Sequence, residues 1–144
     1  MERLIAQSRP SLAVALDLLE RARSEAATRA IALAAAVVDP GGHAVASQRM
    51  DGAALGAMRL AIGKAYTAVL WGTRSGDFMA STQPGGDDWG FNVTDARIVV
   101  CGGGVPLYVD GGLVGALGAS GGTAAEVGDC VTAAALALGF AVAA

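Results

Sequence analysis

The chain has 144 residues, of which 53% are hydrophobic and 16% charged, and 10 Lys+Arg against 13 Asp+Glu give a net charge of −3. A disordered protein lacks so many apolar residues, and an acidic chain without a basic cluster is not typical of a nucleic-acid-binding protein. The longest apolar runs, Ala30–Val38 and Ala133–Ala144, are shorter than the roughly 20 residues of a membrane-spanning helix. We therefore expect one domain over residues 1–144, with no nucleic-acid or membrane partner.

The amino-terminal residues and the cysteines bear on the cellular compartment. Met1-Glu2-Arg3-Leu4 does not open an apolar signal-peptide core, so export is not expected. Cys101 and Cys130 do not form a CxxC pair, and in a chain without an export signal they are more typical of free thiols than of a disulfide. We expect a cytoplasmic protein.

The first predicted element is a helix from Ser8 to Arg29. Leu12, Leu16 and Leu19 recur at the 3–4 spacing of one helical face, and Ser8 is the expected N-cap. The next two elements are predicted strands, Ile31–Val38 and His43–Arg49. The turn sequence Asp39-Pro40-Gly41-Gly42 joins them, which predicts a β-hairpin.

A second helix is predicted from Met58 to Trp71, with a further helical piece over Ser75–Ser81. Thr82–Asn92 is the longest irregular segment. Long loops within compact domains are often functional, so this segment is of interest.

The last part of the chain contains three short strand-like runs and a closing helix. The runs are Ile98–Cys101, Val105–Val109 and Leu113–Leu117, separated by glycine-rich turns, and the helix covers Thr123–Phe140. The order is α-β-β-α-(α)-β-β-β-α, with tight turns instead of crossovers. This order predicts an α+β fold, a five-stranded antiparallel sheet flanked by helices.

Sequence motifs for nucleotide and zinc chemistry are missing. Gly102–Gly104 is not followed by the Lys-Ser/Thr of a P-loop. Gly112, Gly115 and Gly118 fall inside a predicted strand, whereas dinucleotide-binding glycines open a helix. The single histidine excludes a multi-histidine zinc site, and no GxSxG elbow accompanies it. We expect neither a nucleotide cofactor nor zinc.

His43 has two readings. A histidine directly after a Gly-Gly turn is commonly an exposed turn residue, and Asp39 before it is commonly a carboxylate that caps backbone N–H groups. Alternatively, the His43 imidazole is an axial haem ligand or a proton donor. Tyr66, Met50 and Met58 are weaker alternatives as the iron ligand.

Three further positions carry polar chemistry in apolar surroundings. Arg49 and Asp51 are two apart in an extended segment, so they share a face and can hold each other or a polar ligand. Lys64 lies in an apolar helix, where it either reaches solvent or ends beside Asp51 or a ligand carboxylate. Ser120-Gly121-Gly122 opens the closing helix, either as a plain cap and turn or as amides that receive an anion.

Several ordered motifs together resemble the GlcG/HbpS family, in which the C-terminal domain of PduO is also grouped. They cover nearly the whole chain at matching separations. These motifs are Val37-Val38-Asp39-Pro40-Gly41-Gly42, Arg49-Met50-Asp51-Gly52-Ala53, Ala61-x-x-Lys64-Ala65-x-Thr67-Ala68, Gly103-Gly104-Val105-Pro106-Leu107, Asp110-Gly111 and Val114-Gly115-Ala116-Leu117-Gly118-Ala119-Ser120-Gly121-Gly122.

The resemblance implies a five-stranded antiparallel sheet flanked by helices, assembled into dimers or larger rings. Some family members bind or degrade haem, and others sit beside corrinoid or glycolate metabolism. The sequence departs from the family pattern between Gly122 and Asp129, where it carries a couple of extra residues. This departure bears on the start of the closing helix and on any role of Glu126 or Asp129.

The leading hypothesis is a homo-oligomeric small-ligand-binding protein whose ligand is haem or a related tetrapyrrole. Arg49, Lys64 and the amides of Ser120, Gly121 and Gly122 are the expected anion contacts, and His43 is the expected iron ligand.

The alternative is an isomerase, lyase or hydrolase acting on an organic acid or an aromatic-derived metabolite. In that case Asp51 and Lys64 form an acid–base pair and Arg49 holds a substrate carboxylate. A third hypothesis, a scaffold that only assembles, is disfavoured by the long Thr82–Asn92 loop.

Overall fold

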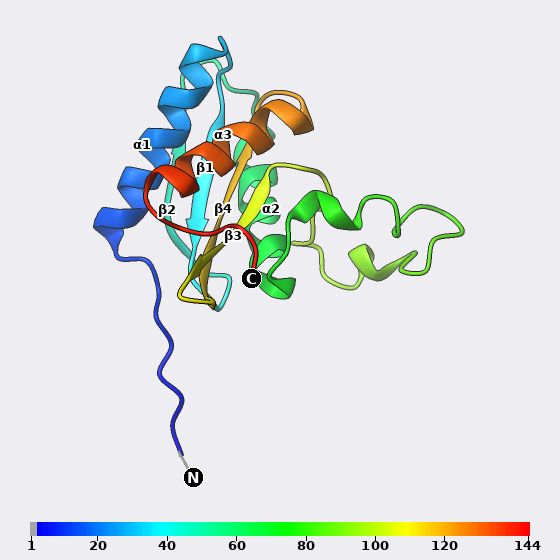
Figure 1. Ribbon diagram of the computed structural model, residues 1–144. Coiled ribbons are helices and arrows are strands. Elements are labelled where there is room, and N and C mark those ends of the chain that lie inside the picture. The colour runs from blue at the N-terminus through cyan, green and yellow to red at the C-terminus, as the bar shows by residue number, and fades with distance from the viewer. Residues whose placement is uncertain (1–2) are drawn as a thin grey trace.

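The computed structural model describes residues 3–144 and shows helices on both faces of one antiparallel sheet (Figure 1). The α+β class is therefore confirmed. Within these residues, no helix is long and apolar enough to cross a membrane. In chain order the elements are α1 (Leu12–Thr28), β1 (Ala34–Val38), β2 (Ala44–Arg49), α2 (Ala57–Trp71), two 3₁₀ turns (Ser75–Phe78 and Phe91–Val93), β3 (Gly104–Val109), β4 (Gly112–Ser120) and α3 (Ala124–Ala137).

The sheet has four strands in the order β2-β1-β4-β3, all antiparallel. Both predicted hairpins are present, because β1 pairs with β2 and β3 pairs with β4. Ala34 of β1 pairs with Arg49 on one side and with Ser120 on the other. Paired residues point to the same face, so Arg49 and Ser120 share the face that α2 covers.

The prediction of a fifth strand over Ile98–Cys101 is wrong, because helix side chains take the polar groups of this segment. The Val99 N–H donates to Thr67 Oγ1 of α2 at 2.8 Å, and Ser75 Oγ donates to the Cys101 carbonyl at 2.6 Å. The free edge of β3 instead meets the carboxyl-terminal tail, where Tyr108 and Ala141 exchange two backbone hydrogen bonds.

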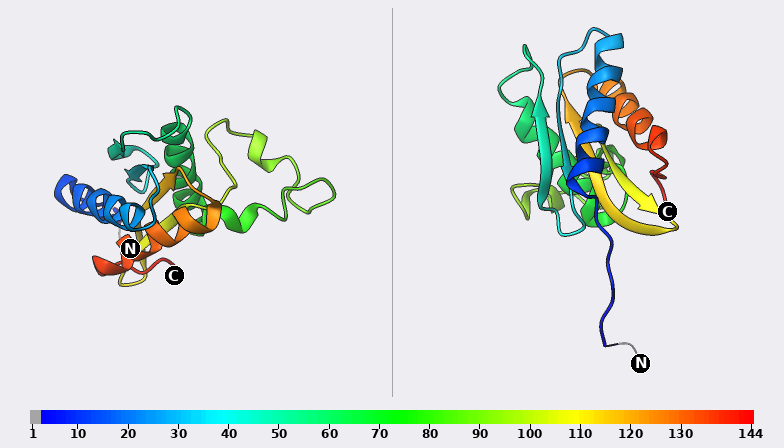
Figure 2. Two further views of the ribbon diagram at one scale, coloured as in Figure 1. Left: turned by 90° about the horizontal axis from the view of Figure 1, so that it is seen from above. Right: turned by 90° about the vertical axis from the view of Figure 1, so that its left-hand side faces the viewer.

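Figure 2 shows α1 and α3 on one face of the sheet and α2 on the other, and the two faces are packed differently. On the face that α1 and α3 cover, large side chains, including Leu18, Leu19 and Leu117, are buried between these helices and the strands. On the other face α2 lies directly on the strand backbone, since a Cβ on Gly118 would overlap the Ala61 carbonyl oxygen. The many alanines and glycines of this chain therefore replace bulk with close approach of the backbones.

The helix ends differ from the predicted ones by a few residues. α1 begins after Ser11, whose Oγ accepts the Val14 N–H at 3.2 Å, so Ser11 is the N-cap and not Ser8. α3 begins after Thr123 in a capping box with Glu126 and ends at Ala137, before Phe140. The helix expected over Ser75–Ser81 is reduced to the 3₁₀ turn.

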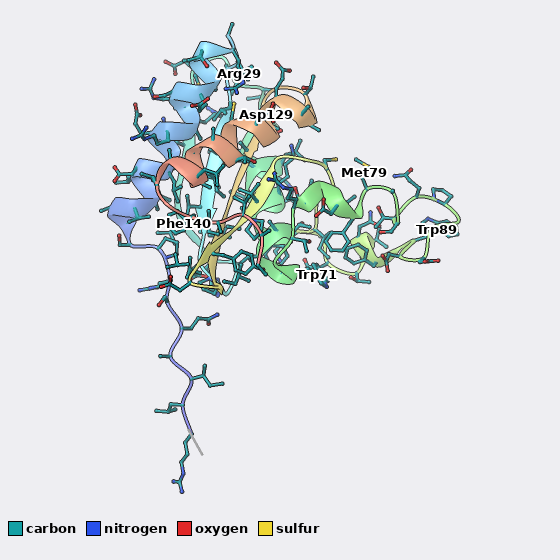
Figure 3. The ribbon with its side chains drawn as sticks, viewed as in Figure 1. Arg29, Trp71, Met79, Trp89, Asp129 and Phe140 are labelled. Carbon is teal, nitrogen blue, oxygen red and sulfur yellow. The ribbon has the colours of Figure 1, made fainter. Side chains whose placement is uncertain are left out.

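The segment between α2 and β3, residues 73–103, extends to one side of the molecule and then returns to the body (Figure 1). Trp71 of α2, Phe78 and Phe91 form a cluster at the base of this projection, with ring centroids 5.1–5.6 Å apart in edge-to-face geometry. Trp89 lies at its tip with 67% of its surface exposed (Figure 3). The irregular Thr82–Asn92 loop predicted from the sequence is part of this projection.

Candidate ligand-binding groove

An open groove of about 720 Å³ runs along the outer face of α2. Its walls are mainly apolar, because α2 turns Leu60 and Ile62 away from the sheet and the preceding turn contributes Leu55. These three side chains are 36–90% exposed. Apolar surface of this kind favours an apolar ligand. The complete lining is Gly42, Leu55, Gly56, Met58, Arg59, Leu60, Ile62, Gly63, Tyr66, Ala96, Arg97 and Val99.

A hydrogen-bonded group of three residues forms the polar end of the groove. The Tyr66 hydroxyl of α2 donates to Asp95 Oδ2 at 2.5 Å. Arg97 donates to both oxygens of the same carboxylate, at 3.0 Å from Nε and 2.8 Å from Nη2. Its guanidinium carbon lies 4.2 Å from the centroid of the Tyr66 ring, a cation–π arrangement. The group joins α2 to the returning end of the projection.

These contacts shift the pKa values in opposite directions. The hydrogen bonds from Arg97, and then the one from Tyr66, hold the pKa of Asp95 well below its usual range, so this carboxylate stays ionised. The hydrogen bond to Asp95 raises the pKa of Tyr66, and burial of the hydroxyl adds to this effect. Tyr66 therefore remains a neutral phenol at neutral pH.

Two guanidinium groups line the groove, those of Arg59 and Arg97, and both side chains are exposed. Arg59 makes no ion pair among the described residues, whereas Arg97 is paired with Asp95. Apolar walls with cationic groups among them can bind an apolar molecule that carries anionic substituents.

His43 lies outside this groove. It is exposed and lines a separate cleft of about 710 Å³, together with Arg9, Leu12 and Val45. Asp39 Oδ1 accepts the backbone N–H groups of Gly41 and His43 at 2.9 and 3.0 Å, so the expected capping role of Asp39 is confirmed. The two lining sets have no residue in common, but Gly42, which lines the groove, directly precedes His43 in the sequence.

The three weaker alternatives for the iron ligand, Tyr66, Met58 and Met50, do not all lie on the same side of the sheet. Tyr66 and Met58 line the groove. Met50 does not, because its sulfur accepts the Leu33 N–H at 3.3 Å and its side chain packs against the core under α1 and α3.

Of the expected anion contacts, Arg49 and Ser120 to Gly122 lie at the end of the sheet where α2 begins. Arg49 and Asp51 are exposed, and among residues 3–144 neither takes part in an ion pair. Ser120 is buried on the α2 face. After Gly121 and Gly122, the capping box joins the Thr123 N–H to Glu126 Oε1 and the Glu126 N–H to Thr123 Oγ1. The N-cap of α3 is therefore Thr123, and the anion-binding role of the Ser120, Gly121 and Gly122 amides stays a prediction. Asp129 is exposed on α3.

Lys64 is buried, with 5% of its surface exposed. Its Nζ donates to the carbonyl oxygen of Ala119 at 3.2 Å, and no ion pair joins it to Asp51. The structure thus does not bring the expected acid–base pair together in the described residues. The catalytic roles assigned to Asp51, Lys64 and Arg49 stay predictions.

Sequence reasoning missed Asp95 and Arg97. The two are separated from Tyr66 by about 30 residues in an irregular segment, where no periodicity reports on spatial contacts. A signal was present in the spacing, since Asp95-Ala96-Arg97 repeats the carboxylate–guanidinium separation of Arg49-Met50-Asp51.

A four-stranded antiparallel sheet between α2 and the α1–α3 pair, with an apolar groove on the exposed side of α2, defines a small α+β fold. The family model for haem degrading protein HbpS-like matches residues 11–136, and the chain belongs to this family.

Two relatives in sequence illustrate the range of the family. An uncharacterized 15.0 kDa protein from the dhaT-dhaS intergenic region of Citrobacter freundii is 34% identical over 114 residues, which cover 78% of this chain and 80% of that protein. The corrinoid adenosyltransferase PduO of the same organism is 31% identical over 126 residues, which cover 84% of this chain. The match spans only 38% of the adenosyltransferase, so the similarity concerns one part of that protein.

Solved structures show the same architecture. A crystal structure of a PduOC–haem complex has a TM-score of 0.90 and 29% identity, covering 94% of this chain and 99% of that one. The Klebsiella pneumoniae protein ORFY has a TM-score of 0.90 and 28% identity, covering 93% of each chain. A crystal structure of HbpS has a TM-score of 0.85 at 24% identity, covering 95% of each chain, and supports the fold alone.

Proposed function

We propose that this protein binds haem or a related tetrapyrrole in the groove on α2, and that it does so in the cytoplasm as a homo-oligomer. The observation that carries the proposal is the apolar groove of about 720 Å³ with Arg59 and Arg97 in its walls. Support comes from the related PduOC chain, which was crystallised with haem. The two cysteines are free thiols, as is usual for proteins of a reducing compartment.

The groove fits the chemistry of a tetrapyrrole. The macrocycle is apolar and would cover Leu55, Leu60 and Ile62, which are otherwise exposed to water. Removing apolar surface from water contributes about 25 cal/mol per Å². Arg59 is positioned to pair with a propionate, and Arg97 has further N–H groups beyond the Asp95 carboxylate. Bound haem would supply an iron centre for redox or oxygen chemistry.

We propose His43 as the first choice of iron ligand. The imidazole is exposed and its ring makes no hydrogen bond within the described part of the chain. It lies one residue from the Gly42 end of the groove. Met58 and Tyr66 are the alternatives inside the groove. Of these, Tyr66 is disfavoured because its hydroxyl is bonded to Asp95 and the rise in its pKa opposes the phenolate form.

The test is a haem titration followed by absorbance, with a matched pair of variants on α2. Leu60 and Leu70 are both 42% exposed, but only Leu60 lines the groove. We expect Leu60→Glu to weaken haem binding at least about tenfold, because a carboxylate would face both the macrocycle and its propionates, and Leu70→Glu to leave binding unchanged. Equal affinity in the two variants would place haem elsewhere.

Self-association is proposed from the projection at residues 73–103. Its exposed apolar side chains, Met79, Trp89 and Val93, are 41–78% exposed in the single chain and are typical of a surface that another subunit covers. Met79 and Trp89 are labelled in Figure 3. Light scattering after size exclusion measures the mass of the assembly. A monomeric mass of 14.2 kDa at micromolar concentration would contradict this part of the proposal.

A further inference from the structure

We propose that residues 3–9 form an arm that pairs with the free edge of β2 in a second copy of this chain. Every residue of the arm is exposed, and Leu4 and Ile5 have 88% and 90% of their surface in contact with water. The arm runs away from the body and lies beside no other element (Figures 1 and 2). Two adjacent large apolar side chains on such a segment are typical of a surface that another molecule covers.

The root of the arm is fixed against the body. Pro10, the first residue after the arm, is buried. Arg9 and Pro10 line the cleft of about 710 Å³, together with Leu12 of α1 and Val45 of β2. The arm therefore leaves the molecule beside the first residues of β2.

The outer edge of β2 is open to pairing. β2 is the last strand on its side of the sheet, and within residues 3–144 no strand or bridge pairs with its outer edge. The Met50 N–H donates to the Leu33 carbonyl oxygen at 2.9 Å, toward β1. Because backbone groups alternate along an antiparallel strand, Ser47 and Arg49 direct their N–H and C=O groups away from β1. These groups can hydrogen-bond an added strand.

The side chains beside this edge suit an apolar arm. Leu12 and Leu16 are one helical turn apart on α1, with 58% and 51% of their surface exposed, and Leu12 shares the cleft with Val45. Residues 44–48 carry neither a charge nor a proline, two of the usual protections of an edge strand. The register shift in the pairing of β1 with β2 confines regular pairing to the part of β2 that follows Val45.

Charge also favours the arm as the occupant. The arm carries Arg3 and Arg9 and no acidic residue. Asp39 lines the cleft before β2, and Asp51 lies two residues after β2. Neither carboxylate makes an ion pair in the described part of the chain. A basic arm and a strand with acidic groups near both ends are complementary.

The geometry favours a second copy over the β2 strand of the same chain. The arm runs away from its own β2 (Figure 2), and a residue before a proline is held extended, which disfavours a sharp reversal at Arg9. Around a two-fold axis beside the cleft, each arm reaches β2 of the other copy, and such a contact closes as a dimer. The seven arm residues span about 23 Å when extended and β2 about 20 Å, so the arm is long enough to follow that edge.

The experiment is disulfide linking between two copies of different isotopic mass, both with Cys101→Ser; Cys130 is buried. One copy carries Ile5→Cys. The other carries Ser47→Cys or, as the matched control, Ser24→Cys, an exposed serine near the opposite end of α1 from the arm. We expect the mixed link from position 5 to position 47 to form several-fold faster than that to position 24. Equal rates would overturn the proposal.

The double variant Ile5→Cys with Ser47→Cys, also with Cys101→Ser, tests which copy holds the arm. We expect its linked product to contain two chains of 14.2 kDa each. A product with the mass of one linked chain would overturn the proposal, because the arm would then lie on its own β2. Adding Leu4→Ser should slow linking several-fold and adding Gln7→Ser should not, since only Leu4 brings a large apolar side chain. Equal effects would contradict the apolar contact.

The interface adds a surface to the self-association proposed above, and it uses neither the projection nor the groove on α2. We expect the link between positions 5 and 47 to persist in a Trp89→Ser background, because Trp89 lies at the tip of the projection. Loss of the link in that background would overturn the arm as an independent interface. Haem titration of the Ile5→Cys chain should match the wild type, so failure of haem binding and failure of the arm contact are seen in separate measurements.

Discussion

The guanidinium of Arg97 lies 4.2 Å from the ring centroid of Tyr66, and both residues hold the same carboxylate, that of Asp95. Asp95 thereby connects α2 to the returning part of the projection. Residues 98–101 of the projection are held by Thr67 of α2 and by Ser75 of the first 3₁₀ turn. This polar group therefore sets where the projection returns to the body, and with it one wall of the groove.

Loss of the Asp95 carboxylate is expected to make stability less sensitive to acid. The pKa of Asp95 is lower in the folded chain than in the unfolded chain, so the unfolded chain binds more protons and the contribution is present above about pH 4 and lost below it. Thermal unfolding should show the wild type more stable than Asp95→Asn at pH 6, with the gap narrowing from pH 4 downwards. A gap independent of pH would contradict this account.

The close packing of α2 on the sheet gives a prediction with an internal control. A Cβ on Gly118 would overlap the backbone of Ala61, whereas a Cβ on Gly128 of α3 would meet open space. We expect Gly118→Ala to lower the free energy of unfolding by about 2–3 kcal/mol. Gly128→Ala should raise it by about 0.5–1 kcal/mol, because alanine favours the helix. Urea denaturation measures both, and equal effects would refute the packing argument.

The sequence predicted the parts of the fold that depend on local patterns. The turn at Asp39–Gly42 and the turn at Asp110–Gly112 specified both hairpins, and helical spacing located α1, α2 and α3. The fifth strand could not be excluded in this way. A run such as Ile98–Cys101 has strand composition, but its hydrogen-bond partners are Thr67 and Ser75, which the chain brings to it only after folding.

The candidate site was less predictable for the same reason. Tyr66 and Met58 were among the expected ligands and do line the groove. Asp95 and Arg97 come from irregular backbone, where position depends on tertiary contacts such as the aromatic cluster of Trp71, Phe78 and Phe91. Burial of Lys64 also depends on packing, since the apolar helix around it allowed a path to solvent as well as to the interior.

Mutation of Ser8 and Ser11 tests which of the two serines is the N-cap of α1. Ser11 Oγ accepts the Val14 N–H, while Ser8 is exposed and precedes the helix. Removal of an N-cap hydroxyl costs about 1 kcal/mol of stability. We expect Ser11→Ala to lower the free energy of unfolding by that amount and Ser8→Ala to leave it unchanged. Urea denaturation distinguishes them, and a larger effect at Ser8 would restore the longer helix expected from the sequence.

The burial of Lys64 gives a prediction on stability. Burial lowers its pKa in the folded chain, so between that value and about pH 10.4 the unfolded chain binds more protons. Stability therefore rises with pH across this range. Lys64→Met removes the titrating group and is expected to be more stable than the wild type by about 1 kcal/mol at pH 7, because an apolar side chain replaces a poorly partnered amine.

The gap between Lys64→Met and the wild type is expected to shrink as the pH rises from 7 toward about 10.4, because the unfolded chain then also loses this proton. Lys64→Arg is the matched control, since a guanidinium keeps its charge throughout. Lys64→Arg should remain less stable than Lys64→Met at every pH. Chemical denaturation between pH 7 and 10 measures the three proteins together. A constant gap between wild type and Lys64→Met would mean that the folded chain holds Lys64 with an ordinary pKa, and that a counter-charge reaches it.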